Sequence, residues 1–307
     1  NDGAANPSFS AANIATSADG AQSVFAADMD GDGDMDIVSA AQEDDAIAWY
    51  ENDGATNPSW TAADIATSAD GGVSVFAADM DNDGDLDIVA ASMGDDAISW
   101  YENNGAANPS WTAADISTSA DGAFSVYVGD LDNDGDLDIV SASDNDDKIA
   151  WYENGLAAFG NHSFTAADIA TSADGPKSVS VVDLDNDGDL DIVSASSNDD
   201  AIAWYENDGA ANPSFTAADI ATSADDASSV RFGDLDNDGD IDIVSASAGD
   251  DAIAWYENDG AADPSFSAAD IATSADGATD IFVVDLDKDG DLDIVSSSFN
   301  ADASKDA

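Results

Sequence analysis

The feature that most constrains this chain is an internal repeat of about fifty residues. A nine-residue, aspartate-rich run begins at Asp28 and recurs at Asp79, Asp130, Asp183, Asp234 and Asp285, at intervals of 51, 51, 53, 51 and 51 residues. The longer interval has a visible source, because residues 154–163 read NGLAAFGNHS where other copies carry a connector two residues shorter, such as NDGAANPS. A fixed period of this length indicates that one supersecondary unit is copied along the chain.

Each unit contains four segments with the pattern of β-strands and none with the pattern of a helix. In the second copy they read VSVFAAD (73–79), LDIVAAS (86–92) and DAISWYE (96–102), and the fourth kind reads WTAADIATS (60–68) in the preceding copy. Short β-branched or aromatic runs bounded by Gly, Asn, Asp and Pro are typical of strands joined by turns. The sequence therefore predicts an all-β chain, a six-bladed β-propeller with four short antiparallel strands in each blade, forming a single domain over residues 1–307.

The first and last residues of the chain fall at neighbouring positions of the repeat. Asn1 aligns with Asn52, so the chain opens with a fourth strand, SFSAANIATS (8–17), while Ala307 aligns with Tyr256, near the end of a third strand. We expect the N-terminal strand to join the last blade and close the ring. The third strand of that blade, DASKDA (302–307), lacks the Ile, Trp and Tyr of DAIAWYE, which weakens closure there.

The composition excludes several classes of partner. The chain has 67 acidic residues against five Lys and Arg, a formal net charge of −62. Nucleic acids and anionic membrane surfaces require clustered Lys and Arg, and no apolar run is long enough to insert into a membrane. The absence of cysteine excludes disulfides, thiol catalysis and cysteine-ligated metals. Metal cations are the natural partners of such a chain.

The aspartate run itself predicts a metal site. In DLDNDGDLD (130–138) aspartates stand at positions 1, 3, 5, 7 and 9, and glycine stands at position 6. A positive φ at that glycine folds the loop so that oxygens two residues apart converge, and all-oxygen ligation of this kind selects calcium. An EF-hand is excluded, because position 12 is Ser or Ala where that motif needs Glu. The ninth aspartate must close the site, and the seventh is expected to offer its backbone carbonyl while its carboxylate faces solvent.

These residues resemble the FG-GAP or VCBS repeat, the blade of integrin-α-type and bacterial surface β-propellers, whose D-x-D-x-D-G-x-x-D loop binds calcium. The resemblance implies about six calcium ions, one in each blade. In the first loop it implies ligation by Asp28, Asp30, Asp32, the backbone of Asp34, and Asp36. The same metal set is implied in the other loops by Asp79, Asp81, Asp83, Asp85 and Asp87; Asp130, Asp132, Asp134, Asp136 and Asp138; Asp183, Asp185, Asp187, Asp189 and Asp191; Asp234, Asp236, Asp238, Asp240 and Asp242; and Asp285, Asp287, Asp289, Asp291 and Asp293.

Repeated aromatic residues offer an alternative, sugar-stacking kind of site. Because an isoleucine two residues earlier shares the tryptophan face, packing between blades is the better interpretation. The residues concerned are Trp49, Trp100, Trp151, Trp204 and Trp255, with a second set at Phe9, Trp60, Trp111, Phe164, Phe215 and Phe266. His162, the single histidine, lies in the irregular connector and is expected to be an exposed turn residue rather than part of a catalytic triad.

Together these observations favour a binding or structural role over catalysis. An active site is normally unique, whereas every acidic cluster here has near copies, so we expect no enzyme. We expect an extracellular, cell-surface module from a marine or saline environment, whose partner is a protein or glycan on a surface or matrix, or another copy of itself. A multivalent carbohydrate-binding lectin and a calcium-dependent polysaccharide-cleaving enzyme remain as alternatives.

Overall fold

A computed structural model describes residues 9–157 and 161–299 and contains strands but no helix in those ranges. The 22 strands form antiparallel sheets, five with four strands and one with two, which confirms the prediction of an all-β chain built from propeller blades. Accordingly, the described residues include no helix long and apolar enough to cross a membrane. The chain separates into two compact units, which we call the N-terminal unit (12–130 and 134–172) and the C-terminal unit (173–299, with 9–11 and 131–133).

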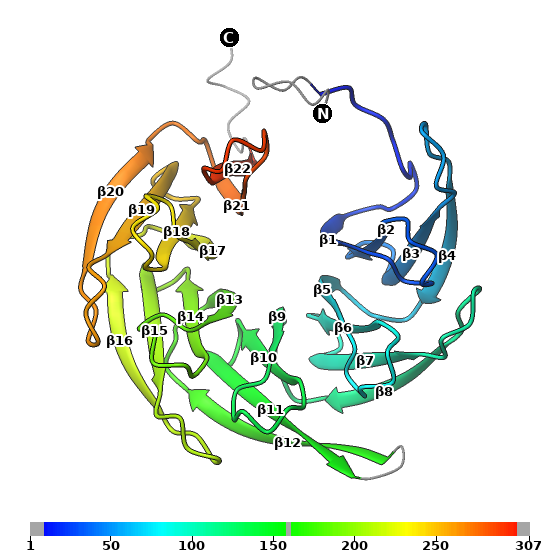
Figure 1. The fold of residues 1–307 in the computed structure, drawn as a ribbon, viewed down its shortest axis with the longest axis horizontal. Coiled ribbons are helices and arrows are strands. Elements are labelled where there is room, and N and C mark those ends of the chain that lie inside the picture. The colour runs from blue at the N-terminus through cyan, green and yellow to red at the C-terminus, as the bar shows by residue number, and fades with distance from the viewer. Residues whose placement is uncertain (1–8, 158–160, 300–307) are drawn as a thin grey trace. The chain divides into compact units, whose positions relative to one another are not determined.

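The N-terminal unit holds three sheets, each with its strands in chain order (Figure 1). The first consists of β1 (Ala21–Ala27), β2 (Asp36–Ala41), β3 (Ala46–Asn52) and β4 (Trp60–Ala66). The second consists of β5 (Gly72–Ala78), β6 (Asp87–Ser92), β7 (Ala97–Asn103) and β8 (Trp111–Ser117). The third consists of β9 (Ala123–Gly129), β10 (Asp138–Ser143), β11 (Lys148–Ala157) and β12 (Asn161–Ala170).

The C-terminal unit holds the remaining three sheets, again with their strands in chain order. One consists of β13 (Pro176–Val182), β14 (Asp191–Ser196), β15 (Ala201–Asn207) and β16 (Phe215–Ala221). The next consists of β17 (Ala227–Gly233), β18 (Asp242–Ser247), β19 (Ala252–Asn258) and β20 (Phe266–Ala272). In the described residues the last contains β21 (Ala278–Val284) and β22 (Asp293–Ser298) alone.

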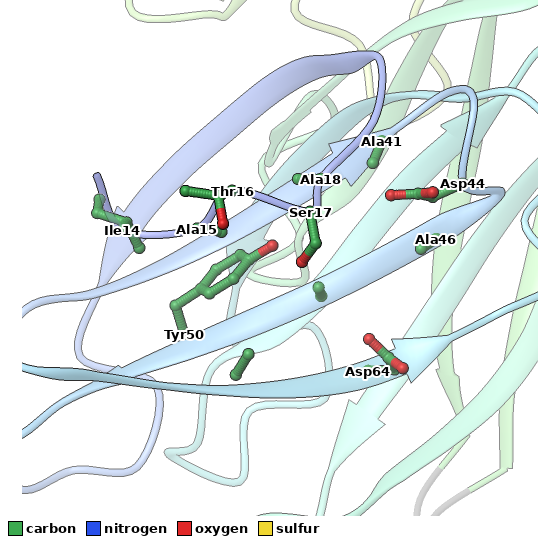
Figure 2. Close-up of a pocket in the computed structure, with 12 residues that line it drawn as sticks. Ile14, Ala15, Thr16, Ser17, Ala18, Ala41, Asp44, Ala46, Tyr50 and Asp64 are labelled. Atoms are coloured by element: carbon green, nitrogen blue, oxygen red, sulfur yellow. The ribbon is translucent and has the colours of Figure 1, made fainter.

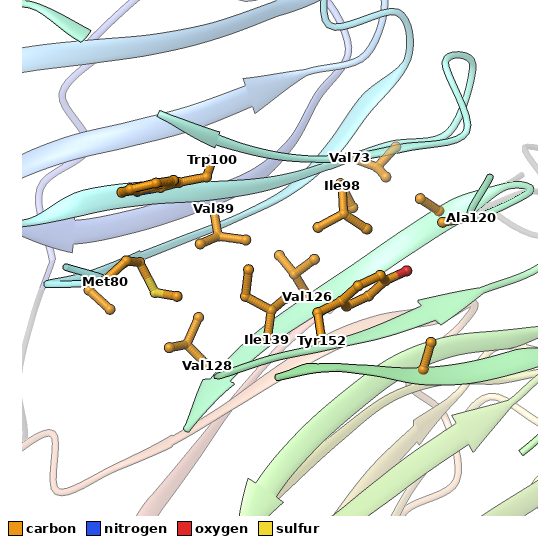
Figure 3. Packing of buried hydrophobic residues seen from close by; sticks show 14 residues of the cluster. Val73, Met80, Val89, Ile98, Trp100, Ala120, Val126, Val128, Ile139 and Tyr152 are labelled. Atoms are coloured by element: carbon orange, nitrogen blue, oxygen red, sulfur yellow. The ribbon is translucent and has the colours of Figure 1, made fainter. Parts of the chain in front are cut away.

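The core lies between neighbouring sheets and follows the alternation of side chains along each strand. Figure 3 shows one such layer, in which Val89, Ile98 and Trp100 of the second sheet face Val126 and Ile139 of the third. In the N-terminal unit the second sheet thus packs one face against the first sheet and the other against the third, so neither of its faces is left to solvent.

The expected ring closure is not detected. Residues 9–17 of the predicted N-terminal strand form no strand, and the sheet of β21 and β22 gains no third or fourth member from the described chain. The N-terminal strand could join the last sheet only by pairing with a third strand there. That third strand was predicted at 302–307, which has lost its apolar residues and lies outside the described residues. Closure therefore stays a prediction, as does the assignment of the whole chain to one domain.

Candidate functional site

Each aspartate run is the loop between the first two strands of a sheet. The run 79–87, for example, links β5 to β6, and its backbone turns at two residues with positive φ. Position 6 is Gly84, with a φ of 98°, and position 4 is Asn82, with a φ of 58°. Only glycine reaches the first conformation without strain, whereas asparagine tolerates the second. The glycine turn expected from the sequence is confirmed.

The loop brings carboxylates at positions 1, 3 and 5 together. Asp79, Asp81 and Asp83 each present an oxygen within 4.8 Å of the others. Backbone N–H groups hold these carboxylates in place: Asp83 donates to Asp79 Oδ1 at 3.0 Å, and Gly84 donates to Asp79 Oδ2 at 3.0 Å. Clusters at the same three positions form at Asp28, Asp30 and Asp32; at Asp183, Asp185 and Asp187; and at Asp234, Asp236 and Asp238. In the third loop the cluster consists of Asp130 and Asp132 with the ninth residue, Asp138. A set of hard carboxylate oxygens fits calcium, which takes oxygen ligands almost exclusively.

The ninth aspartate lies beneath the loop rather than on its surface. Asp87 is fully buried, and its two oxygens accept hydrogen bonds from the backbone N–H of Asn103 at 2.7 Å and of Met80 at 3.2 Å. One carboxylate therefore ties the end of β7 to the second residue of the loop. The same pair of bonds forms at Asp36, Asp191 and Asp242.

Burial makes this carboxylate costly to ionise in the metal-free chain. Desolvation raises the pKa of Asp87 from 3.8 to about 7, although the backbone N–H of Asn103 and the indole N–H of Trp100 oppose the shift. Burial likewise raises the pKa of Asp191 to about 7. A divalent cation beside such a group would favour its charged form.

The seventh aspartate departs from the expectation that its carboxylate faces solvent. Asp85 lies against Gly105, which follows β7 and has a φ of 64°, and a Cβ added at Gly105 would overlap the carboxylate. In the third loop, Asp136 Oδ1 also accepts a hydrogen bond of 3.1 Å from Asn82 Nδ2 of the second loop. The seventh side chain is thus a packing and bridging group, and its backbone carbonyl remains the predicted ligand.

The sixth loop is the least regular. Position 4 is Lys288, with a φ of 64°, where four other loops have asparagine. Its ninth residue, Asp293, is exposed, although it still accepts a hydrogen bond of 3.0 Å from the backbone N–H of Leu286. The described part of its sheet ends at β22, so nothing in the described chain covers this carboxylate as β7 covers Asp87.

Four of the five repeated tryptophans confirm the packing interpretation, and the fifth, Trp255, is partly buried. Trp49, Trp100, Trp151 and Trp204 are only 2–5% exposed, so their rings cannot stack on a sugar. In the second aromatic set, Phe164 lies edge-on to Trp100, with ring centroids 6.2 Å apart, and Trp111 packs against the core between the first two sheets. Phe9 is 61% exposed, so the packing prediction is wrong for that residue. His162 lies within β12, where its backbone pairs with Leu156, rather than in a turn.

A cavity of about 310 Å³ lies on the first sheet, between residues 14–18 and strands β2 to β4 (Figure 2). Tyr50, Asp44 and Asp64 are its larger polar side chains, and the rest of its lining is mainly alanine. The second sheet carries the same residue types at Tyr101, Asp95 and Asp115. The cavity therefore contains no chemistry that the repeat does not already have.

One group of site residues escaped the sequence reasoning. In four of the five AWYEN or SWYEN segments the final asparagine is buried and donates through its side chain to two loop carbonyls; Asn103 Nδ2 lies 2.9 Å from the oxygen of Met29 and 3.0 Å from that of Leu86. Asn52, in the first segment, is only partly buried and donates to the carbonyl of Met35. The recurrence of this asparagine three residues after each tryptophan was the sequence feature that could have drawn attention to it. The acceptors are up to 76 residues away in the chain, so the role could not be predicted from local sequence.

Comparison with family models finds matches to one described as the FG-GAP-like repeat. They cover residues 28–90, 79–141, 130–194, 183–245 and 234–296, each spanning two successive aspartate loops. The FG-GAP resemblance inferred from the sequence is confirmed. No curated protein matches the chain.

Solved structures with a similar fold include a Lactobacillus plantarum protein, 18% identical, with a TM-score of 0.60 over 90% of this chain and 76% of that one. A Bacillus licheniformis rhamnogalacturonan lyase is 12% identical, with a TM-score of 0.50 over 91% of this chain and 55% of the lyase. The Vibrio cholerae biofilm matrix protein Bap1 is 19% identical, with a TM-score of 0.47 over 85% of this chain and 40% of that one. This chain thus spans only about half of the lyase, and identities this low show a shared fold alone.

Proposed function

Since the chain belongs to the FG-GAP-like repeat family, we propose that it is a calcium-stabilised, extracellular β-propeller module with a structural or adhesive role in a surface protein or assembly. The observation that carries this proposal is the convergence of three carboxylates in one loop after another, each on the same backbone turn. Repetition of one site along the fold suits a structural device better than a reaction centre.

Within each loop the residues have separate tasks. The carboxylates at positions 1, 3 and 5 and the carbonyl at position 7 would hold the ion, while the ninth carboxylate, buried in the first five loops, closes the loop from below. Calcium would supply positive charge among carboxylates that otherwise repel each other by roughly 3 kcal/mol per pair at 5 Å and an effective dielectric near 20. Bound ions would thereby staple the first two strands of every blade.

An extracellular setting follows from the affinity expected of such sites. Extracellular calcium modules bind with dissociation constants of about 10⁻⁴ to 10⁻³ M, so millimolar calcium outside cells would fill them. Six ions would reduce the net charge only from −62 to −50. The remaining acidity suits a saline environment, where salt screens repulsion between surface charges.

We propose no catalytic role for the loops, because a similar carboxylate cluster recurs in one loop after another. The partner in this proposal is a protein or glycan on a surface or matrix. Lectin sites built on Trp49, Trp100, Trp151 and Trp204 are excluded by their burial. The fold shared with a rhamnogalacturonan lyase leaves cleavage of an acidic polysaccharide as the second candidate, to be tested by turnover of uronic-acid polymers.

The decisive experiment is calorimetric titration of CaCl₂ into the chelator-stripped chain, with thermal melting of the same samples. We expect uptake of about six ions and a large rise in melting temperature. A matched variant carrying Asp79→Asn, Asp81→Asn and Asp83→Asn should bind one ion fewer. Uptake without any gain in melting temperature would contradict the structural role, and no uptake would contradict the calcium sites.

A further inference from the structure

Consecutive aspartate loops are joined by hydrogen bonds at their surface. Asn82 Nδ2, at position 4 of the second loop, donates to Asp136 Oδ1, at position 7 of the third, at 3.1 Å. In the C-terminal unit Asn186 donates to Asp240 at 3.3 Å and Asn237 to Asp291 at 3.0 Å. We call these contacts the surface bridges. Each starts between two predicted ligands of one loop and ends on the residue whose carbonyl is a predicted ligand of the next.

A second, buried connection runs beneath the first. Asn103, 2% exposed, donates from Nδ2 to the carbonyl of Met29 in the first loop and to that of Leu86 in the second. The same clasp is made by Asn154 on Met80 and Leu137, and by Asn258 on Leu184 and Ile241. One amide therefore holds position 2 of a loop and position 8 of the loop that follows.

The first loop provides a natural comparison. Its position 4 is Gly31, with a φ of 72°, which has no side chain to donate to Asp85 of the second loop. The first and second loops therefore have the buried clasp of Asn103 without a surface bridge from position 4, whereas the second and third have both connections.

We propose that the surface bridges make cation binding cooperative between neighbouring loops of each unit, with the position-4 asparagines as positioning residues. The inference rests on the proposed calcium function and goes beyond it, because independent calcium staples need no bridges. The proposal predicts that the calcium affinity of one loop depends on whether the neighbouring loop is occupied.

The physical basis is the ordering of each loop. Without a cation, mutual repulsion of the carboxylates loosens the loop, and binding must restrict its backbone. A cation held by Asp81 and Asp83 restricts Asn82 between them, and the bridge passes that restriction to Asp136. The third loop then has less conformational freedom left to lose when it binds its own ion, which is positive coupling.

Position-6 glycines allow the effect to be measured loop by loop. Gly84 and Gly135 each donate their N–H to the first carboxylate of their own loop at 3.0 Å, so each amide resonance reports on its own site. The experiment is titration of the chelator-stripped full chain with CaCl₂, following the amide resonances of these glycines and of Gly239 in the C-terminal unit by NMR.

Two exchanges at position 4 form a matched pair. Asn82→Gly removes the bridge while keeping a residue that accepts positive φ, and Gly31→Asn adds an amide facing Asp85, with no atom within 4 Å of the new Cβ. Asn82→Gly should move the Gly135 midpoint to about fivefold higher calcium, the lower end of measured couplings, and Gly31→Asn should lower the Gly84 midpoint. The calcium midpoint at Gly239 should be unchanged in both variants.

The outcomes separate the two proposals. If calcium binds but Asn82→Gly shifts only Gly84, in its own loop, the coupling is overturned and the calcium sites stand. If CaCl₂ moves none of the glycine resonances, both proposals fail. A double-mutant cycle of Asn82→Gly with Asp136→Ala should be non-additive at Gly135, because both changes break the same bridge.

Discussion

The backbone N–H of Asn103 donates a 2.7 Å hydrogen bond to the carboxylate of Asp87, sixteen residues earlier in the chain, and both residues are buried. This bond fastens the last residue of β7 to the ninth position of the second aspartate loop. It places an ionisable carboxyl group inside the blade, so the stability of the blade depends on the protonation state of Asp87.

Asp87→Ala should destabilise the protein strongly. The change leaves the buried N–H groups of Asn103 and Met80 without acceptors, at about 1–3 kcal/mol each. Urea denaturation in saturating calcium measures the loss. The matched control is Asp293→Ala, at the equivalent but exposed position, which should cost much less; equal losses would contradict the role of burial.

In chelator, the metal-free protein should lose stability as the pH rises from 5 to 8. Burial raises the pKa of Asp87 and Asp191 to about 7, so the folded state holds their protons more tightly than the unfolded state does. Their contribution is complete below pH 4 and disappears as the pH rises through 7. Urea midpoints at the two pH values measure the effect, and Asp87→Asn with Asp191→Asn should flatten the dependence. A midpoint that increases with pH would contradict this account.

Gly105→Ala should destabilise the second blade and weaken the proposed calcium binding of its aspartate loop. The backbone at Gly105 has a φ of 64°, which costs an alanine roughly 1–2 kcal/mol, and the added Cβ would displace the carboxylate of Asp85. Thermal melting with and without calcium tests both effects. Gly155→Ala is the control, because the nearest atom to a Cβ there lies 3.3 Å away and its φ is not positive; it should change little.

Ile98→Ala should cost about 2–5 kcal/mol, since Ile98 is fully buried between the second and third sheets. Ile271→Ala, at a residue that is 50% exposed, should cost a small fraction of that. Chemical denaturation compares the two variants. Similar losses would mean that the layer between the sheets does not carry the stability assigned to it.

Local pattern was enough for much of this fold. The segment VSVFAAD at 73–79 was expected to be a strand and corresponds to β5 at Gly72–Ala78, because alternation and turn residues act over a few positions. The turn at Gly84 was predictable for the same reason. The strand expected at 8–17 was wrong over residues 9–17, since a strand forms only where a partner strand exists.

The sequence alone determined the period of the repeat, the kinds of strand, the family and the residues of the aspartate loops. Tertiary structure decided which of those residues are buried or bridged. SVFAAD occurs identically at 23–28 and at 74–79, yet Val24 is 67% exposed and Val75 is 5% exposed. Val75 packs beneath the preceding sheet, whereas within its own unit the first sheet has none before it. Likewise, the bridge from Asn82 to Asp136 depends on two loops 54 residues apart coming together, which no local pattern encodes.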